Sequence, residues 1–400
     1  MRISSPVLKL RDFRLLIAAT FFESFMRGEN VVLGWVILEL TDSPFMVGLA
    51  MGIRAAPGFF LGITAGTISD LVDRRKFMRL LMALAVLVAL TMGLLLSSGK
   101  GELWHLLVIP VFSGTIHMMF NTAKQSFVFD LVGRENGLNG MSYLGLSMRG
   151  GGMLGALGVG FALAKWGAGA GYFVVAVACC IAVVFLGFIA SRGKSAPSRR
   201  GNIFTGFSEF WKEMRQNRTI AGLVFIVMLV EFFGFTPNNA LMPSIARDVW
   251  GLGPQGLGIL NAFSSGGGML AIAVISLVGH IRYQGLAFIV VLHLFGGALL
   301  LLGFAPSVYV AVIAIVILSG TMALSDLFSQ TLLQRLVPND LRGRIMGAWT
   351  TAVGTGPVGN LEIGALASLM GVTVALTFHG GGLVLLAIIT LLTFKRLRRI

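Results

Sequence analysis

Two acidic residues occupy matching positions in the two halves of the chain, each inside a long apolar stretch. Glu23 lies within 15–38 and Glu231 within 220–245, and Glu231 follows Glu23 by 208 residues. The same spacing relates Asn30 to Asn238. A carboxylate in hydrocarbon costs several kcal/mol, so acids in such places usually bind ions or protons, or form ion pairs. We expect one of these roles for both acids.

The neighbours of the two acids differ. Arg27 follows Glu23 by four residues and therefore shares its helix face, so we expect the two side chains to pair. Asn30 continues this face. In the second half, Phe235 stands where the first half has Arg27. Glu231 is therefore the better candidate for a carboxyl that takes up and releases a proton.

Two further apolar stretches carry polar groups within one or two helical turns. Asp326 precedes Gln330 by one turn, and His117, Asn121 and Lys124 follow one another in 103–129. Lys124 is near the cytoplasmic end of its stretch and has two interpretations: its amine reaches the membrane surface, or, with Arg27, it leaves room for an anionic substrate. A core role for His117 is as probable as a functional one.

Other charged residues in or near the apolar stretches have simpler interpretations. Glu29 and Glu39 are expected near the outer membrane surface, in contact with water. Arg54 and Arg149 are expected to form structural pairs, although the sequence names no partner for them or for Glu362.

These residues must be positioned by membrane-spanning helices. Hydrophobic residues make up 56% of the chain and charged residues only 12%, whereas about 25% of residues are charged in soluble domains. Stretches of about 20 apolar residues cross a bilayer as helices. Turn residues and charges delimit twelve such apolar stretches, which are 13–40, 44–69, 77–96, 103–129, 138–166, 171–190, 219–246, 255–279, 285–304, 307–334, 342–369 and 372–394. The expected fold is an all-α membrane protein.

The net charge of +14 has two explanations, nucleic-acid binding or membrane orientation. With both termini in the cytoplasm, the cytoplasmic segments hold 24 of the 31 Lys and Arg residues, and the opposite loops hold only Lys100, Lys165 and Arg247. This asymmetry follows the positive-inside rule. We therefore expect a multi-pass protein of the cell (inner or plasma) membrane with both termini inside, and no nucleic-acid partner.

The chain reads as a duplicated unit. The polar connection 191–218 separates six spans from six, which predicts an N-terminal bundle in 1–190, a linker with an amphipathic helix, and a C-terminal bundle in 219–400. An offset of 205 residues places Gln125 on Gln330 and Asn121 on Asp326. Such parallel repeats, with the substrate site between them, are a known plan for transporters.

A motif lies between the second and third spans, where Gly66, Asp70, Arg74 and Arg75 occur at fixed spacing. It resembles the signature loop of the major facilitator superfamily, although Leu71 and Asp73 replace a basic residue and a glycine. Its Asp-Arg-Arg ending is similar to the branch of enterobactin-type siderophore exporters and drug-efflux proteins. That resemblance extends over nearly the whole chain.

The resemblance implies the major facilitator fold, two pseudo-symmetric six-helix bundles that make up twelve transmembrane helices. In this superfamily the first, fourth, seventh and tenth spans line the cavity. The implied cavity residues are Glu23, Arg27, Asn30, His117, Asn121, Glu231, Asn238, Asn239, Asp326 and Gln330. It also implies a cytoplasmic gate, in which Asp70 meets the start of the eleventh span and Arg74 pairs with Asp130. Glycines in the fifth span are expected to pack helices closely.

We therefore expect a secondary transporter, a proton-coupled exporter of small amphipathic molecules such as drugs or siderophores, acting by alternating access. Glu231 is the leading proton carrier, with Asp326 and Glu23 as further candidates. A metal-ion carrier using Glu23, Asp326 and His117, or a lysophospholipid carrier, stays open. An enzyme or receptor is the remaining alternative, but the sequence has no catalytic motif or metal-ligand spacing. No cofactor is implied; family resemblance implies a monomer.

Overall fold

The computed structural model describes residues 6–133, 135–191, 193, 218–278, 281–336 and 352–394, without the side chains of 6, 59–71, 138, 218–219 and 334–336. Within these ranges every regular element is a helix. This is the arrangement that hydrocarbon demands, because a helix satisfies its own backbone hydrogen bonds. The predicted linker helix and Arg342 to Met346 lie outside the described residues.

The described chain separates into two compact units. The first comprises Met1–Leu40, Ile53–Arg200 and Leu252–Ala262, and the second comprises Thr41–Gly52, Gly201–Gly251 and Phe263–Ile400. Two helices, α3 (Pro44–Leu71) and α11 (Pro254–Val278), contribute residues to both units.

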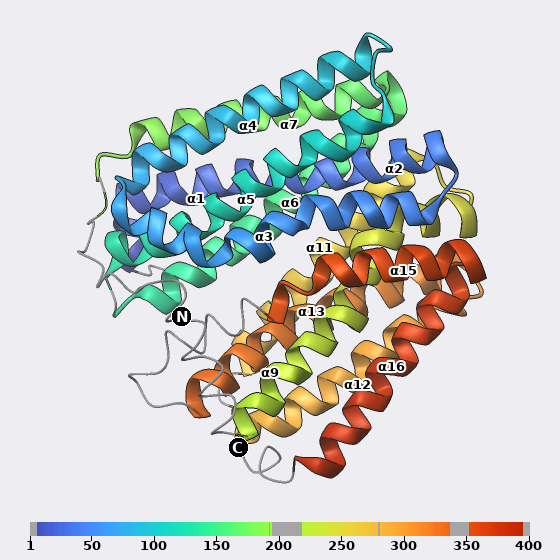
Figure 1. The fold of residues 1–400 in the computed structure, drawn as a ribbon. Helices are drawn as coiled ribbons and strands as arrows, with labels where there is room; N and C mark the ends of the chain where they lie inside the picture. The colour runs from blue at the N-terminus through green and yellow to red at the C-terminus, as the bar shows by residue number, and fades with distance from the viewer. Residues whose placement is uncertain are drawn as a thin grey trace. The chain divides into compact units, whose positions relative to one another are not determined.

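The first unit is built mainly from six predicted spans. A short helix, η1 (Pro6–Lys9), precedes the first span, which consists of α1 (Arg11–Glu23), η2 (Ser24–Gly28) and α2 (Glu29–Thr41). The later helices are α4 (Arg74–Ser97), α5 (Leu103–Val132), α6 (Gly137–Trp166) and α7 (Ala168–Phe188). Helices α4 and α7 run side by side, and α1 packs against α6 and α7 (Figure 1).

The second unit begins its helices with α9 (Arg218–Val230), which continues through η3 (Glu231–Phe235), η4 (Pro237–Leu241), α10 (Met242–Ser244) and η5 (Ile245–Val249). Its other helices are α12 (Gln284–Gly303), α13 (Val308–Leu336), α15 (Gly356–Met370) and α16 (Val372–Thr393). Helix α16 lies along α12 and also contacts α15 and η3 (Figure 1).

Helices lie in the described part of every predicted span. In the described part of the chain, nine helices are long and apolar enough to cross a membrane. The other three predicted spans correspond to the interrupted α1–η2–α2 segment, to α3 and to α15. Many large apolar side chains are exposed, among them Leu87, Leu277 and Leu369. Exposure of this kind over whole helices is typical of a surface that contacts lipid.

Glycines allow two tight connections between helices and one close contact of helix backbones. Gly167 and Gly371 have φ of +86° and +90° and join α6 to α7 and α15 to α16 at matching places in the repeat. The glycine-rich part of α6 packs closely, as the sequence predicts. A Cβ on Gly151 would lie 2.0 Å from the carbonyl oxygen of Phe21, so the backbone of α1 rests directly on α6.

Candidate functional site

Glu23 lies at an interruption of the first span. It is the last residue of α1, and the next five residues form the 3-10 helix η2 before α2 begins. The close packing of η2 on α6 fixes this segment, because a Cβ on Gly28 would lie 2.7 Å from Val159 Cγ2. Stretches of 3-10 helix within a longer helix often mark functional hinges. The Glu23 side chain is fully buried.

Two side chains of α5 hold the Glu23 carboxylate. Lys124 Nζ lies 3.3 Å from Oε2, and His117 Nδ1 lies 2.9 Å from Oε1. The Lys124 side chain is itself buried, with its amine 5.3 Å from the centre of the Phe120 ring. Of the two interpretations of Lys124, the one that places its amine at the membrane surface is wrong, because its counter-ion is inside the unit. A buried ion pair of this kind is costly to break.

The other predicted residues of this unit lie around the pair. Asn121 Nδ2 donates a 3.0 Å hydrogen bond to the backbone carbonyl of His117 and lies 3.0 Å from its Nε2. Arg27 is exposed; it interacts electrostatically with Glu23, but the contacts described for that carboxylate come from α5. The expected Glu23–Arg27 pair is thus replaced by the contacts from α5. Asn30 is half-buried.

A second buried carboxylate in this unit is an unexpected finding. Glu29 is only 1% exposed, accepts a 2.9 Å hydrogen bond from Ser113 Oγ and lies 3.3 Å from Arg54 Nη2. The expectation that Glu29 meets water is wrong, whereas the expected structural pairing of Arg54 is confirmed. The signal was present in the sequence, since an arginine inside a span needs a counter-ion. Glu39 is exposed, as expected.

Glu231 also lies at an interruption, this time of the seventh span. It begins the π-helical segment η3, and two more π-helical segments follow in the same span. Pro237 and Pro243 lack an N–H, so the regular hydrogen-bond ladder cannot run through this region. Single π-helical turns inside α-helices occur frequently at functional sites. The two halves thus place an acid at an irregular helix in matching spans.

The surroundings of Glu231 contrast with those of Glu23. Glu231 is 9% exposed, and its Oε1 faces Gly356 at the start of α15, 3.5 Å from the position of an added Cβ. Asp326 of α13 is close enough to interact with it electrostatically. Among the residues that the structure describes, no Lys, Arg or His lies within ion-pair distance of Glu231. Glu231 therefore has an acidic neighbour where Glu23 has basic ones.

The remaining predicted residues of the second unit are only partly brought together. Ser264 Oγ donates a 3.1 Å hydrogen bond to Asn238 Oδ1 and lies 2.5 Å from Ser319 Oγ. This chain of hydroxyls ties the seventh span to α11 and α13. Asn239 and Gln330 are half-buried.

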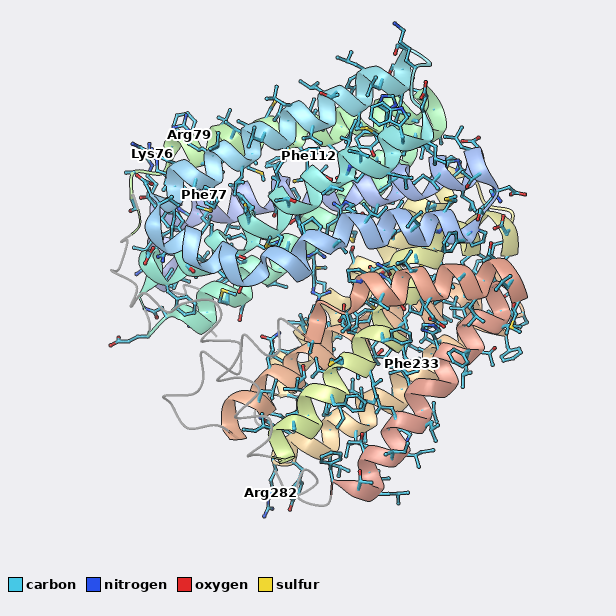
Figure 2. All side chains as sticks on the ribbon, in the orientation of Figure 1. Lys76, Phe77, Arg79, Phe112, Phe233 and Arg282 are labelled. Carbon is cyan, nitrogen blue, oxygen red and sulfur yellow. The ribbon has the colours of Figure 1, made fainter. Side chains whose placement is uncertain are left out.

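The side chains of the signature loop are described from Val72 onward. The expected ion pair is present, with Arg74 Nη1 2.5 Å from Asp130 Oδ2, and Arg75 Nη1 donates to the carbonyl of Ala190. Asp73 accepts a 3.1 Å hydrogen bond from the Lys76 N–H and so caps α4, which explains an acid where the family has a glycine. The side chain of Asp70 lies outside the described residues, so its expected contact with the eleventh span is untested. Figure 2 shows Lys76 and Arg79 at this end of α4.

Neither a metal centre nor a polar pocket accompanies the buried acids in the described structure. In the described ranges no cluster of three or more His, Cys, Asp or Glu residues could hold a metal ion. A groove of about 350 Å³ in the first unit is lined by apolar side chains such as Phe22, Phe25 and Phe173. It contains no group that could bind a proton or an ion, so the buried acids are the candidate site.

The comparison with known proteins decides the family. The model of the Major Facilitator Superfamily matches residues 15–359. The chain belongs to the major facilitator superfamily. It is 25% identical over 391 residues to the enterobactin exporter EntS of Salmonella choleraesuis (strain SC-B67), covering 97% of this chain and 93% of that protein. EntS of Escherichia coli O81 (strain ED1a) is 24% identical over 393 residues, covering 97% and 92%.

Solved structures of major facilitator proteins share the fold. A variant of the nucleoside transporter NupG has a TM-score of 0.79 at 12% identity, with 96% of this chain and all of that chain (100%) covered. A POT family transporter in complex with a thioalcohol-conjugated peptide has a TM-score of 0.83 at 14% identity, with 97% and 96% covered. The predicted all-α major facilitator fold is confirmed, and the protein is a multi-pass membrane transporter of small molecules rather than an enzyme.

Proposed function

We propose that this major facilitator protein is a proton-coupled exporter in which Glu231 carries the coupled proton. The observation that carries the proposal is the pair of acids at interrupted helices, of which only one has basic partners in the described structure. Discontinuous helices at corresponding positions of two repeats are the best pointer to a transport site. The proposal assigns different tasks to the two acids.

Glu23 is proposed to be mainly a fixed charge. Its carboxylate is held by Lys124 and His117, so protonating it would leave a buried ammonium without a counter-ion. Protonating Glu231 removes a charge that burial and the neighbouring Asp326 both disfavour. Proton uptake at Glu231 thus neutralises a costly charge, whereas uptake at Glu23 creates one. Asp326 shares the acidic site.

The proposed substrate is an enterobactin-like siderophore or another small amphipathic molecule. The support is the name of the relatives, enterobactin exporter, together with coverage of nearly the whole length of both chains. Arg27 adds an exposed guanidinium beside the first acid, where it can contact an anionic group. Asn30, His117 and Asn121 supply further polar contacts in this proposal.

The transport cycle is proposed to be alternating access by two bundles, 1–190 and 219–400, acting as a monomer in the cell membrane with both termini in the cytoplasm. The Arg74–Asp130 pair would then lie at the cytoplasmic end of the first bundle, where Gly66, Asp70 and Arg75 complete a gate. Helix α6 contributes a backbone surface without side chains, on which a neighbouring helix can slide.

The test uses the purified protein in proteoliposomes with an imposed proton gradient and iron-free enterobactin as the probe. Glu231→Gln cannot titrate, so gradient-driven transport should fall at least tenfold, whereas exchange of labelled for unlabelled substrate should persist. The matched control is Glu39→Gln, since Glu39 is exposed and should transport like the unmodified protein. Full gradient-driven transport by Glu231→Gln would refute the assignment. Absence of enterobactin transport by the unmodified protein would refute the enterobactin-like siderophore as its substrate.

A further inference from the structure

The second unit contains a Glu–His pair that the proposed pathway does not use. Glu362 Oε2 of α15 lies 2.9 Å from His379 Nε2 of α16. The His379 side chain is fully buried, whereas that of Glu362 is 33% exposed. A buried imidazole with a partly exposed carboxyl at hydrogen-bond distance has a route by which a proton can arrive.

The other nitrogen of His379 has a fixed role. Its Nδ1 lies 3.1 Å from the backbone carbonyl oxygen of Phe233 in η3, and a carbonyl oxygen only accepts. An α-helix would pair this carbonyl with the N–H of the residue four positions later, but that residue is Pro237, which has none. The Nδ1 atom therefore carries a hydrogen and donates it to the Phe233 carbonyl.

This leaves Nε2 facing Glu362 with no hydrogen of its own if the imidazole is neutral. The lone pair of Nε2 and a carboxylate oxygen are both acceptors, and two acceptors 2.9 Å apart repel each other. The contact becomes a hydrogen bond only when one proton lies between the two atoms, on the carboxyl or on the imidazole. We propose that Glu362 and His379 form a proton-binding site, one proton being shared between Oε2 and Nε2.

Aromatic rings surround the His379 imidazole, and few charged residues lie in the elements around it. The rings of Phe232, Phe233 and Phe378 lie 5.5 to 5.9 Å from the imidazole ring, centre to centre, and Figure 2 shows Phe233 in the second unit. The elements packed against α15 and α16 are α9, η3, η4, α12 and the Thr41–Gly52 segment. In them the other charged or titratable residues are Arg218, Glu231, His293 and Asp42. Of these, Asp42 pairs with Arg247, and His293 Nδ1 contacts the carbonyl of Ile289.

Proton binding at this site is linked to the helix that carries Glu231. Loss of the proton sets two acceptors against each other and loosens the contact between α15 and α16. The same imidazole holds the Phe233 carbonyl, two residues from Glu231. The site goes beyond the proposed function, because it binds its proton whether or not Glu231 carries the coupled one.

The experiment is solid-state NMR of the full chain in lipid nanodiscs, with ¹⁵N-labelled histidine. His379→Gln assigns the signal among the five histidines. Over a pH series we expect Nδ1 to stay protonated and Nε2 to report a shared proton that is lost as the pH rises. In Glu362→Gln the amide N–H can donate to Nε2 at every pH, so this step should disappear. Proton uptake over the same pH series should fall by one per chain.

Two results would overturn the site. One is a His379 signal in the unmodified protein that shows an unshared, hydrogen-free Nε2 at every pH, a measurement that needs no variant at position 362. The other is the same titration step in Glu362→Gln and in the unmodified protein. Glu39→Gln serves as the control for loss of a carboxyl elsewhere and should keep the step. Glu231→Gln should keep it too, which separates this site from the proposed coupling residue.

Discussion

Glu23 and Glu231 are acidic side chains in matching spans, but their neighbours have opposite charges. Glu23 is surrounded by a lysine and a histidine from α5, so its negative charge is compensated where it lies. Glu231 has Asp326 as its electrostatic neighbour, so its negative charge is opposed. These different neighbours are the reason why the proposed function gives Glu23 a structural role and Glu231 the coupled proton. The same division separates Glu29, which is paired with Arg54, from Glu362, which meets a histidine.

Lys124→Met tests whether the Glu23 pair is structural. The change leaves a fully buried carboxylate without its ammonium, and such losses cost about 3–5 kcal/mol of stability. The double variant Glu23→Gln with Lys124→Met removes both charges and should recover most of that loss. Unfolding in detergent, followed by circular dichroism, measures both. If Lys124→Met alone proves as stable as the unmodified protein, the pair contributes nothing to the fold.

At the scale of elements, the two interrupted spans are held by different means. In the first span, η2 is fixed from outside by close packing on α6, at Gly28 and Gly155. In the seventh span, Pro237 and Pro243 interrupt the hydrogen-bond ladder from within, and His379 Nδ1 contacts the carbonyl of Phe233. Turn residues and composition predicted where both spans lie. They did not predict the interruptions. The 3-10 turn of the first span is set by a neighbouring helix and leaves no mark in its own sequence. In the seventh span, the two prolines could have predicted the interruption.

Two glycines on α6 form a matched pair for testing the packing. A Cβ on Gly151 would lie 2.0 Å from the backbone oxygen of Phe21, whereas a Cβ on Gly145 would meet nothing within 4 Å. Gly151→Ala should therefore force α1 and α6 apart and cost about 1–3 kcal/mol. Gly145→Ala should be neutral or stabilise the helix by about 0.5–1 kcal/mol. Thermal unfolding of the two variants in one detergent compares them, and equal stability would show that α1 does not depend on this contact.

For the whole molecule, the sequence predicted the fold class and the family, because apolar length and the signature loop are both local in the chain. It predicted the Arg74–Asp130 pair through the family resemblance. It misplaced Glu29 and left the place of Lys124 open, because their counter-ions Arg54 and Glu23 are 25 and 101 residues away and only folding brings them together. The position of a charged residue along a span did not predict whether its side chain is buried, since a charge near the end of a span can still turn inward to a counter-ion.

The orientation of the molecule in the membrane is predicted from the distribution of charge alone. If the Lys and Arg excess marks the cytoplasmic side, Lys9 lies inside, and Lys100 and Lys165 lie outside; all three are exposed. With Cys179 and Cys180 replaced, Lys100→Cys and Lys165→Cys should react with a membrane-impermeant maleimide in intact cells, and Lys9→Cys only after permeabilisation. The reverse pattern would put the Arg74–Asp130 pair on the outer side of the membrane. The proposed gate would then close the opposite end of the pathway, and the direction of transport would have to be argued anew.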